Sequence, residues 1–303
     1  MYFRNIVDAI GHTSLVEMAQ ISPNKKVKIL AKLEGQSPGG SASVKDRVAK
    51  YMLQKAEQSG ELTRDKVIIE ATSGNTGIAL AWLGHQRGYK VTIVMPDSMS
   101  LERRQLLKIH NAELILTKGA YGMKGAIDTA RELLAKDKKY FMPDQFSNPA
   151  NPLAHYETTG TEIINDFPYD KIDALIAGIG TGGTITGLGQ RLKERYPNIK
   201  VIAVEPPAGD NIQGLKCLGE EPPPFWDSSL AVERNFVTSH QAAVATRQLL
   251  DKEGVFAGLS SGAVIHQAIK VANEMEEGNI VVVLADGGWK YLSLDFWTKA
   301  ERI

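Results

Sequence analysis

Ser43-Val44-Lys45-Asp46-Arg47 is the stretch around which the rest of the chain is organised. It follows a polar, glycine-bearing segment, residues 33–41, and apolar residues recur at helical spacing from Val48 onward. The pattern predicts a helix over residues 44–59 with Lys45 in its first turn. A lysine is electrostatically unfavourable there, because the start of a helix already carries partial positive charge. Lys45 is therefore either part of a solvated charge cluster or a Schiff-base lysine, whose amine stays reactive in an electropositive, partly dry site.

Short β-branched runs alternate with longer helical patterns along the whole chain. This alternation is typical of βαβ units, so we expect an α/β fold with a parallel sheet. The predicted strands are Val27–Ala31, Lys66–Ile69, Lys90–Met95, Ala112–Leu116, Ala174–Ala177, Lys200–Val204 and Ile280–Ala285. The predicted helices are Val44–Ser59, Thr76–Arg87, Ser100–His110, Lys124–Lys136, Thr186–Tyr196, Gln241–Glu253 and Ala263–Glu276. Residues 147–152 are a candidate domain hinge, and residues 206–227 form a long irregular segment of a kind that often carries function.

Composition excludes several classes of protein. The 303 residues suffice for one large or two medium domains. Lys and Arg, 35 in all, balance 35 Asp and Glu, so no overall field attracts nucleic acid or an anionic membrane. The one cysteine, Cys217, excludes an intramolecular disulfide and a Cys-x-x-Cys site, and the histidines lack the spacing of metal ligands. The N-terminus lacks a signal-peptide run, and the longest apolar run, Ile280–Ala285, is too short to cross a bilayer. We expect a soluble, cytoplasmic protein.

A cluster of small polar residues follows the predicted strand that ends at Ile69: Glu70-Ala71-Thr72-Ser73-Gly74-Asn75-Thr76-Gly77. Hydroxyls, an amide and backbone N–H groups at a strand-to-helix junction form a carboxylate or phosphate cradle. The same residue types also favour an ordinary helix-capping turn.

Another predicted strand is joined to a helix by Gly178-Ile179-Gly180-Thr181-Gly182-Gly183-Thr184. The loop contains G-x-G-x-x-G, and Glu205 follows at the end of the next strand, as in a dinucleotide-binding fingerprint. That acidic residue comes later than the roughly 20 residues usual in the fingerprint. Two hydroxyls suit a single phosphate, so a phosphate site and a dinucleotide site are both open at this point.

Two further segments carry polar side chains suited to a ligand. Gly258-Leu259-Ser260-Ser261-Gly262 precedes the last long helical pattern, where Ser260 either caps the helix or hydrogen-bonds a neutral ring nitrogen. Gln145, just before the candidate hinge, is either a surface residue or an amide donor to a substrate carboxylate.

Together, these segments resemble the cysteine synthase (O-acetylserine sulfhydrylase) family of fold-type II pyridoxal-phosphate enzymes. No single motif is specific, whereas their order along nearly the whole chain is. The stretches that carry the resemblance are 10–16, 43–47, 72–77, 95–104, 145–152, 158–160, 180–184, 258–262 and 291–293.

The resemblance implies a role for each site residue. Lys45 forms the Schiff base with pyridoxal 5'-phosphate and later shuttles the Cα proton. Asn75 hydrogen-bonds the ring hydroxyl of the cofactor, and Ser260 contacts its pyridine nitrogen. The cofactor phosphate is held by Gly180, Thr181, Gly182, Gly183 and Thr184. The substrate carboxylate is bound by Thr72, Ser73, Thr76 and Gln145.

The implied reaction is a β-replacement. An activated serine loses its β-substituent to give an α-aminoacrylate, and sulfide then adds to give L-cysteine. The implied fold is tryptophan synthase β-like, with the cofactor between two three-layer α/β domains that have twisted, mostly parallel sheets. We expect residues 1–42 and 152–303 to form the larger domain that anchors the cofactor, and residues 43–151 to form the smaller, mobile, substrate-binding domain. The family is usually homodimeric.

The second half of the chain is most similar to the branch of this family that uses O-phosphoserine, through residues 253–258 and 285–293. That branch places an arginine on the long irregular segment to meet the substrate phosphate, and Lys216 stands at the matching position. Lysine supplies charge without a bidentate fork, so O-acetylserine and O-phosphoserine both stay open as substrates. Some members of the branch take sulfur from a small carrier protein with the help of a long C-terminal tail. This chain ends at Ile303, soon after the last motif, and we expect sulfide as the donor. The sequence does not determine whether a sulfur-carrier protein or a serine acetyltransferase is a partner.

The sequence also departs from the family pattern, and alternatives follow. Ser41–Ser43 adds two residues before Lys45 relative to the usual Gly-Gly-Ser-Val-Lys, which concerns the geometry of the loop more than the lysine. A cystathionine β-synthase-like or serine/threonine dehydratase-like enzyme would share the fold, but residues 145–149 argue for cysteine synthase. An NAD-binding oxidoreductase would use the G-x-G-x-x-G loop and Glu205, and it leaves Lys45 and residues 72–77 unexplained.

Overall fold

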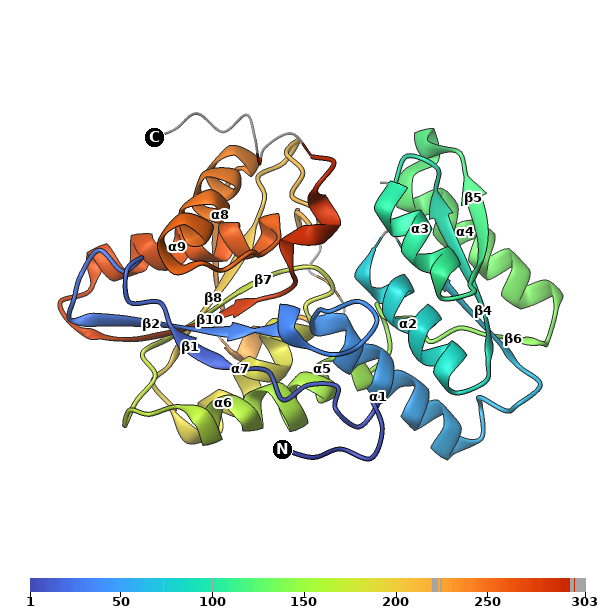
Figure 1. Cartoon of the computed structure of the whole chain (residues 1–303), viewed down its shortest axis with the longest axis horizontal. Coiled ribbons are helices and arrows are strands. Elements are labelled where there is room, and N and C mark those ends of the chain that lie inside the picture. Colours follow the sequence, from blue (N-terminus) through green and yellow to red (C-terminus); the bar gives the residue numbers. More distant parts are fainter. Residues whose placement is uncertain are drawn as a thin grey trace. The chain divides into compact units, whose positions relative to one another are not determined.

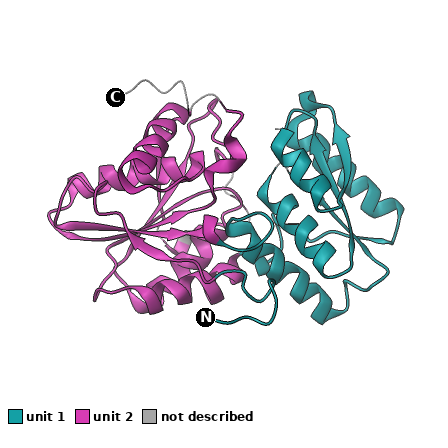
Figure 2. Ribbon diagram, in the orientation of Figure 1, with its two compact units in different colours: residues 1–11, 37–151 teal, residues 12–36, 152–303 magenta. Residues whose placement is uncertain are grey.

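A computed structural model of the chain describes residues 1–72, 74–99, 101–219, 223, 225–230, 232–294 and 297. It divides into two compact units (Figure 2). Unit 1 comprises residues 1–11 and 37–151, and unit 2 comprises residues 12–36 and 152–303. Each unit is a mostly parallel sheet with helices on both faces, which confirms the predicted α/β fold class (Figure 1).

The sheet of unit 1 has the strand order β5-β4-β3-β6, and all of its pairings are parallel. Its strands are β3 (Val67–Ala71), β4 (Lys90–Pro96), β5 (Glu113–Thr117) and β6 (Tyr140–Phe141). Its helices are α1 (Val44–Ser59), α2 (Asn75–Gln86), α3 (Leu101–Ile109) and α4 (Gly122–Lys136), and α5 (Ala150–Ala154) spans the boundary at Asn151. Helices α1 and α2 share one core with β4, whereas Ala126 and Ala130 of α4 pack against Ile69 and Val94 on the opposite face.

The sheet of unit 2 has the strand order β1-β2-β10-β7-β8-β9, and only the β1–β2 pair among these is antiparallel. Its strands are β1 (Leu15–Glu17), β2 (Val27–Leu33), β7 (Ala174–Gly178), β8 (Lys200–Glu205), β9 (Glu233–Phe236) and β10 (Gly278–Leu284). Its helices are α6 (Gly160–Asp166), α7 (Gly183–Arg195), α8 (Ser239–Glu253) and α9 (Leu259–Glu274). Helices α8 and α9 cover one face of the sheet, and α6 and α7 lie at the other (Figure 1). Short 3-10 turns lie at Glu34–Gln36, Gly119–Tyr121, Ser228–Leu230 and Gly288–Tyr291, and a π-helical turn at His155–Thr159.

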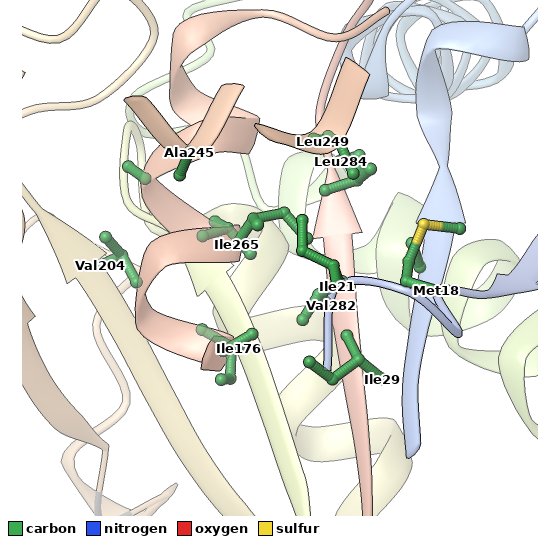
Figure 3. Packing of buried hydrophobic residues seen from close by; sticks show 14 of the residues in the cluster. Met18, Ile21, Ile29, Ile176, Val204, Ala245, Leu249, Ile265, Val282 and Leu284 are labelled. Carbon is green, nitrogen blue, oxygen red and sulfur yellow. The ribbon is translucent and has the colours of Figure 1, made fainter. Parts of the chain in front are cut away.

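The main core of unit 2 lies between its sheet and helices α8 and α9 (Figure 3). Ile265 of α9 belongs to one buried cluster with Ile176 of β7 and Val282 of β10, and all three side chains are fully buried. Burying one such side chain stabilises the fold by about 1.5–3 kcal/mol. Because parallel strands are covered on both faces, their sequences are nearly continuous apolar runs, and these runs made the strands predictable.

Several elements differ from the predicted ones. Helix α9 begins at Leu259 rather than Ala263, so Ser260 lies in its first turn. Strands β1, β6 and β9 were not predicted, because β6 has two residues and the other two pair near the surface. The part of residues 206–227 that the structure describes is irregular, and a 3-10 turn follows it at Ser228. In the described ranges, no helix has the length and apolarity that a membrane crossing requires, and no group of His, Cys, Asp and Glu has the geometry to hold a metal ion.

Candidate active site

Lys45 is the second residue of α1, as predicted. Ser43 caps this helix: its hydroxyl accepts the Lys45 N–H at 3.1 Å, and Asp46 completes a capping box. Although the residue is only half-buried as a whole, the surroundings of its amine are dry, and this desolvation lowers the pKa of Lys45 from 10.5 to about 8. Lys45 therefore has an amine that loses its proton far more readily than a solvated lysine does.

The two extra residues before Lys45 are held by the first turn of α1. The Asp46 carboxylate accepts the Ser41 N–H at 3.0 Å and the Ser41 hydroxyl at 2.7 Å through one oxygen, and the Ser43 N–H at 3.0 Å through the other. Ala42 has a positive φ of 42°, which is unusual for a residue with a side chain. The longer loop is thus closed onto Asp46, and it leaves Lys45 at the helix start.

The polar loop that follows β3, which we call the carboxylate loop (residues 72–77), opens α2 at Asn75. The Thr72 hydroxyl accepts the Gly74 N–H at 3.3 Å, and both Thr72 and Thr76 are buried. Ser73, which was predicted to bind substrate with them, lies outside the described residues. The loop therefore offers both hydroxyls and the backbone N–H groups at the start of α2.

Gln145 lies beside the carboxylate loop within unit 1. Strand β6 pairs with β3 in parallel, so the segments that follow both strands emerge at one edge of the sheet. The Thr76 hydroxyl donates to Gln145 Oε1 at 2.6 Å, and the Gln145 side chain is only 4% exposed. The structure therefore brings together Thr76 and Gln145, which are 69 positions apart and were both predicted to bind the substrate carboxylate.

The glycine-rich loop that follows β7, which we call the phosphate loop (residues 180–184), opens α7. Gly182, at the N-cap, has a φ of 87°, a conformation that favours glycine. The Thr181 hydroxyl accepts the Gly183 N–H at 3.2 Å, and the Thr184 hydroxyl lies 3.2 Å from His155 Nε2. Backbone N–H groups at the start of a helix, with two hydroxyls beside them, are a donor set suited to a phosphate.

Glu205 does not have the position that a dinucleotide site needs. Its carboxylate is fully buried, accepts Arg234 Nε at 2.6 Å through one oxygen, and accepts the Leu218 N–H at 2.8 Å through the other. Both oxygens are thus occupied by the protein's own groups rather than directed at a ribose. This removes the acidic residue on which the dinucleotide interpretation depended.

Residues 212–218 form an irregular segment that packs on the phosphate loop within unit 2. The Lys216 N–H donates to the Ile179 carbonyl at 2.8 Å. A Cβ added to Gly180 would lie 3.1 Å from the Gly214 carbonyl oxygen, and a Cβ added to Gly214 would lie 3.5 Å from Ser260 Oγ. Lys216, Ser260 and the phosphate loop are therefore neighbours, as the proposed roles of these residues require. Among the described residues, the Ser260 hydroxyl has no hydrogen-bond partner, although the side chain is 5% exposed.

Comparison with known proteins identifies the family. Residues 6–286 match the family described as pyridoxal-phosphate dependent enzyme. The chain belongs to this family. A cysteine synthase of Staphylococcus aureus strain Mu50 is 43% identical over 308 residues, which cover 97% of each protein. The crystal structure of O-ureido-L-serine synthase has a TM-score of 0.93 at 37% identity, covering 100% of this chain and 98% of that chain. O-acetyl serine sulfhydrylase isoform 3 of Entamoeba histolytica has a TM-score of 0.92 at 36% identity, covering 100% and 94%.

These findings confirm the predicted resemblance and the cofactor, pyridoxal phosphate. The residues of this pyridoxal-phosphate dependent enzyme also fit that cofactor chemically. The phosphate loop offers helix-start N–H groups and hydroxyls, the Ser260 hydroxyl has a hydrogen bond to give, and Lys45 has a readily deprotonated amine. A phosphate anchor, a ring contact and an amine are what this cofactor needs from a protein.

Two residues next to this set were not predicted as functional. Glu70 is the buried carboxylate near the end of β3, and His155 joins Thr184 to Thr159, whose hydroxyl lies 3.0 Å from His155 Nδ1. A charged residue at the end of a β-branched apolar strand was the available signal for Glu70. His155 gave no such signal, because its partner is 29 positions away in the chain.

Proposed function

We propose that this protein is a pyridoxal-phosphate-dependent β-replacement enzyme that makes L-cysteine from an activated serine and sulfide. The observation that carries this proposal is Lys45, whose amine has a pKa near 8 at the start of α1. The 43% identity to a cysteine synthase over 97% of the chain supports the choice of reaction.

In this proposal the bound cofactor supplies the electron sink that allows a β-substituent to leave. Lys45 holds the cofactor and then carries the proton of the substrate Cα atom, which a neutral amine can accept. The pKa near 8 leaves a useful fraction of the amine neutral at ordinary pH.

The carboxylate loop and Gln145 bind the substrate carboxylate. Thr72 supplies a hydroxyl donor and Gln145 supplies its amide. The Thr76 hydroxyl donates to Gln145 Oε1, so Thr76 contributes its backbone N–H at the start of α2. Ser73 is part of the same proposal on sequence alone. Asn75, the first residue of α2, would bond the ring hydroxyl of the cofactor. The role of this set is to orient the amino acid rather than to react with it.

Unit 2 contributes the residues proposed to contact the cofactor phosphate and ring nitrogen. Gly180, Thr181, Gly182, Gly183 and Thr184 would bind its phosphate, and the Ser260 hydroxyl would donate to its ring nitrogen. A hydroxyl would not stabilise a proton on that nitrogen as a carboxylate would, so Ser260 suits a neutral ring.

The organisation of the molecule in solution is part of the proposal. On the resemblance to cysteine synthases, we expect residues 43–151 to move as a substrate-binding domain, two chains to form a homodimer, and the enzyme to act in the cytoplasm. Loss of activity on rigidly linking the two units, and a dimer mass in solution, would support the first two.

The leaving group is the open chemical question, and Lys216 bears on it. Its backbone is pinned to Ile179 beside the phosphate loop, so its charge lies on the segment that neighbours the predicted cofactor phosphate. A cation there favours O-phosphoserine over O-acetylserine. Lys216→Ala should raise the KM for O-phosphoserine about 10-fold, because an exposed charge pair contributes about 1 kcal/mol to binding and a partly desolvated pair contributes more. The KM for O-acetylserine should be unchanged, because this substrate has no phosphate for the lysine to pair with. Lys252→Ala, on α8, is the matched control. Equal effects on both substrates would remove the phosphate contact from the proposal.

The whole proposal is tested by the purified protein with pyridoxal phosphate. We expect a visible absorbance band that shifts when O-acetylserine or O-phosphoserine is added, and cysteine formation with sulfide. Formation of cystathionine, pyruvate and O-ureido-L-serine should be measured alongside, because these products separate the related reactions. A protein that stays colourless with the cofactor, or that makes only one of the other products, contradicts the proposal.

A further inference from the structure

The carboxylate of Glu70 is buried near the end of β3 with no function assigned to it. Its residue is 2% exposed, and the preceding Ile68 and Ile69 are fully buried. Within the described part of the chain, no cationic side chain pairs with Glu70. A buried charge is costly unless hydrogen bonds compensate it, so donors are expected at both carboxylate oxygens of Glu70.

Both Glu70 oxygens accept hydrogen bonds from the segment that follows β6. Oε2 accepts the Asp144 N–H at 3.0 Å, and Oε1 accepts the Gln145 N–H at 3.1 Å. Asp144 has a positive φ of 50°, a conformation that side chains rarely adopt. Two consecutive N–H groups held by one carboxylate fix the backbone in this strained turn, and with it the direction in which the Gln145 side chain leaves the chain.

The Gln145 side chain is itself fixed at its oxygen. Oε1 accepts the Thr76 hydroxyl at 2.6 Å, and the Gln145 carbonyl accepts Asn151 Nδ2 at 2.7 Å. Among the described residues, Nε2 of Gln145 makes no hydrogen bond, so this N–H group is left to donate to a ligand. Its orientation depends on the backbone that Glu70 holds and on the Thr76 hydroxyl.

We propose that Glu70 is a positioning residue for the substrate-carboxylate site: it fixes residues 144 and 145 so that the Gln145 amide presents Nε2 to the substrate carboxylate. This rests on the proposed function, because it takes the Gln145 amide as a donor to the substrate carboxylate. Glu70 acts through Gln145 and touches neither substrate nor cofactor.

The electrostatics of Glu70 are compatible with a neighbouring anionic substrate. Burial, with a smaller contribution from Asp144, raises the pKa of Glu70 to about 8, while the two N–H groups act in the opposite direction. A carboxyl group that holds its proton near neutral pH repels a substrate carboxylate less than a fixed negative charge would.

Glu70→Gln tests the proposal in the holoenzyme. The amide keeps one acceptor oxygen, but its NH₂ group faces the second backbone N–H, so one of the two hydrogen bonds is lost. We expect the KM for O-acetylserine to rise about 10-fold with kcat changed less than about 3-fold, the signature of weakened substrate binding. The cofactor absorbance band should be unchanged. Glu113→Gln is the matched control, because Glu113 lies on β5 of the same sheet and accepts the Thr92 hydroxyl at 3.0 Å.

A second readout separates positioning from general loss of structure. In the parent, O-acetylserine should be preferred to its methyl ester, which lacks the carboxylate charge. Glu70→Gln should reduce this preference about 10-fold, because only the acid uses the Gln145 amide. A merely structural defect would lower the activity on both compounds equally. If the glutamine variant does not fold, Glu70→Asp retains the carboxyl group, withdraws it by one methylene, and should show the same selective loss.

Hydrogen–deuterium exchange over residues 143–146 completes the test. The amides of residues 144 and 145 should exchange faster in the Glu70 variant than in the parent, and those of the Glu113 variant should not. An unchanged KM, acid preference and exchange rate in an active holoenzyme would overturn the positioning role. If the parent itself makes no cysteine, the proposed function is wrong. The exchange experiment still tests the backbone restraint in that case, because unchanged exchange at residues 144 and 145 in the Glu70 variant would show that Glu70 does not fix them.

Discussion

Unit 1 and unit 2 each contain a loop that leaves a buried parallel strand and opens a helix, yet the two loops offer different donors. The carboxylate loop presents the hydroxyls of Thr72 and Thr76, and Gln145 joins it from the neighbouring strand. The phosphate loop contains the positive-φ Gly182 and offers backbone N–H groups at the start of α7. Both loops have hydroxyls and helix-start N–H groups, so the difference lies in what is added to them. In the proposed function, the first binds a planar carboxylate with the help of a side-chain amide, and the second binds a tetrahedral phosphate with a glycine-shaped main chain.

Each unit also contains a buried glutamate whose side chain accepts backbone N–H groups from a distant segment of the same unit. Glu70 holds residues 144 and 145 through N–H groups, whereas Glu205 holds Leu218 and is paired with Arg234. The first carboxyl lacks a cationic partner among the described residues, and its pKa is raised. A buried carboxylate thus fixes a backbone segment in both units, with a cationic partner in unit 2 and without one in unit 1, where Glu70 lies next to the proposed carboxylate site.

The largest expected effect comes from Lys45 of unit 1. Lys45→Ala should lower kcat by about 10³-fold or more, because it removes the group that transfers the proton. The absorbance of the lysine-bound cofactor should disappear with it. Lys50→Ala, which changes another half-buried lysine of α1, should retain most activity. Turnover near the parent level in Lys45→Ala would take the lysine out of the mechanism.

The contrast between side-chain and main-chain donors is tested by matched threonine changes. Thr76→Val should raise the KM for the amino acid substrate about 10-fold, because the Gln145 amide loses the hydroxyl that fixes its oxygen and then binds the substrate carboxylate less well. Thr181→Val should weaken cofactor binding only about 3-fold, because backbone N–H groups remain to bind the phosphate. Substrate KM and cofactor titration measure the two effects. A larger loss from Thr181→Val would mean that both loops depend on side chains.

Glycine at the start of α7 is tested by Gly182→Ala. A side chain at this φ of 87° costs about 1–2 kcal/mol, so cofactor affinity should fall about 10-fold if the loop distorts to relieve it. Gly254→Ala, at the end of α8 with a φ of 69° and no atom within 4 Å of the added Cβ, is the control. The control should lose stability without losing cofactor affinity. An equal loss of cofactor affinity in both variants would show that the loss does not arise in the phosphate loop.

The last expected effect is on stability rather than activity, and it concerns the pH dependence that Glu70 contributes. The pKa of Glu70 rises from 4.5 to about 8 on folding, so between these values the folded state holds a proton that the unfolded state releases. The contribution of this group to stability therefore decreases as pH rises from about 5 to 8. Glu70→Gln should flatten this part of the pH dependence, measured as the difference from the parent in urea unfolding at pH 5, 6.5 and 8. Parallel profiles for the two proteins would show that Glu70 does not titrate in this range.

Much of the fold was predictable because strong local signals coincide with it. Helix α1 spans Val44–Ser59 as expected, since its period, its Ser43 cap and its Gly60 end all agree. The strands that were found are long, apolar and buried on both faces. The family resemblance then supplied the cofactor, which no single motif of the chain specifies.

The contacts within the site were less predictable, for a physical reason. Gln145 meets Thr76 only because the two-residue strand β6 pairs with β3, and two residues carry almost no periodic signal. The loop from Ser41 to Ser43 was recognised as longer than usual, but its attachment to Asp46 depends on side-chain geometry that spacing does not give. Glu70 was visible as a charged residue in an apolar strand, whereas its partners lie 74 and 75 positions further along the chain.

The pairing of β2 with β10 has a consequence for the way the chain is made. These strands lie side by side from Val27–Gly278 to Leu33–Leu284. Strand β2 therefore cannot form this pairing until almost the last part of the chain has left the ribosome. Residues 37–151, in contrast, belong to one compact unit and emerge early. Chains generally fold domain by domain during synthesis, and such long-range pairings form late. During translation, all residues of unit 1, which contains Lys45, are therefore synthesised before the sheet of unit 2 can form completely. The nascent chain can fold the region around Lys45 long before it can fold the sheet that carries the phosphate loop.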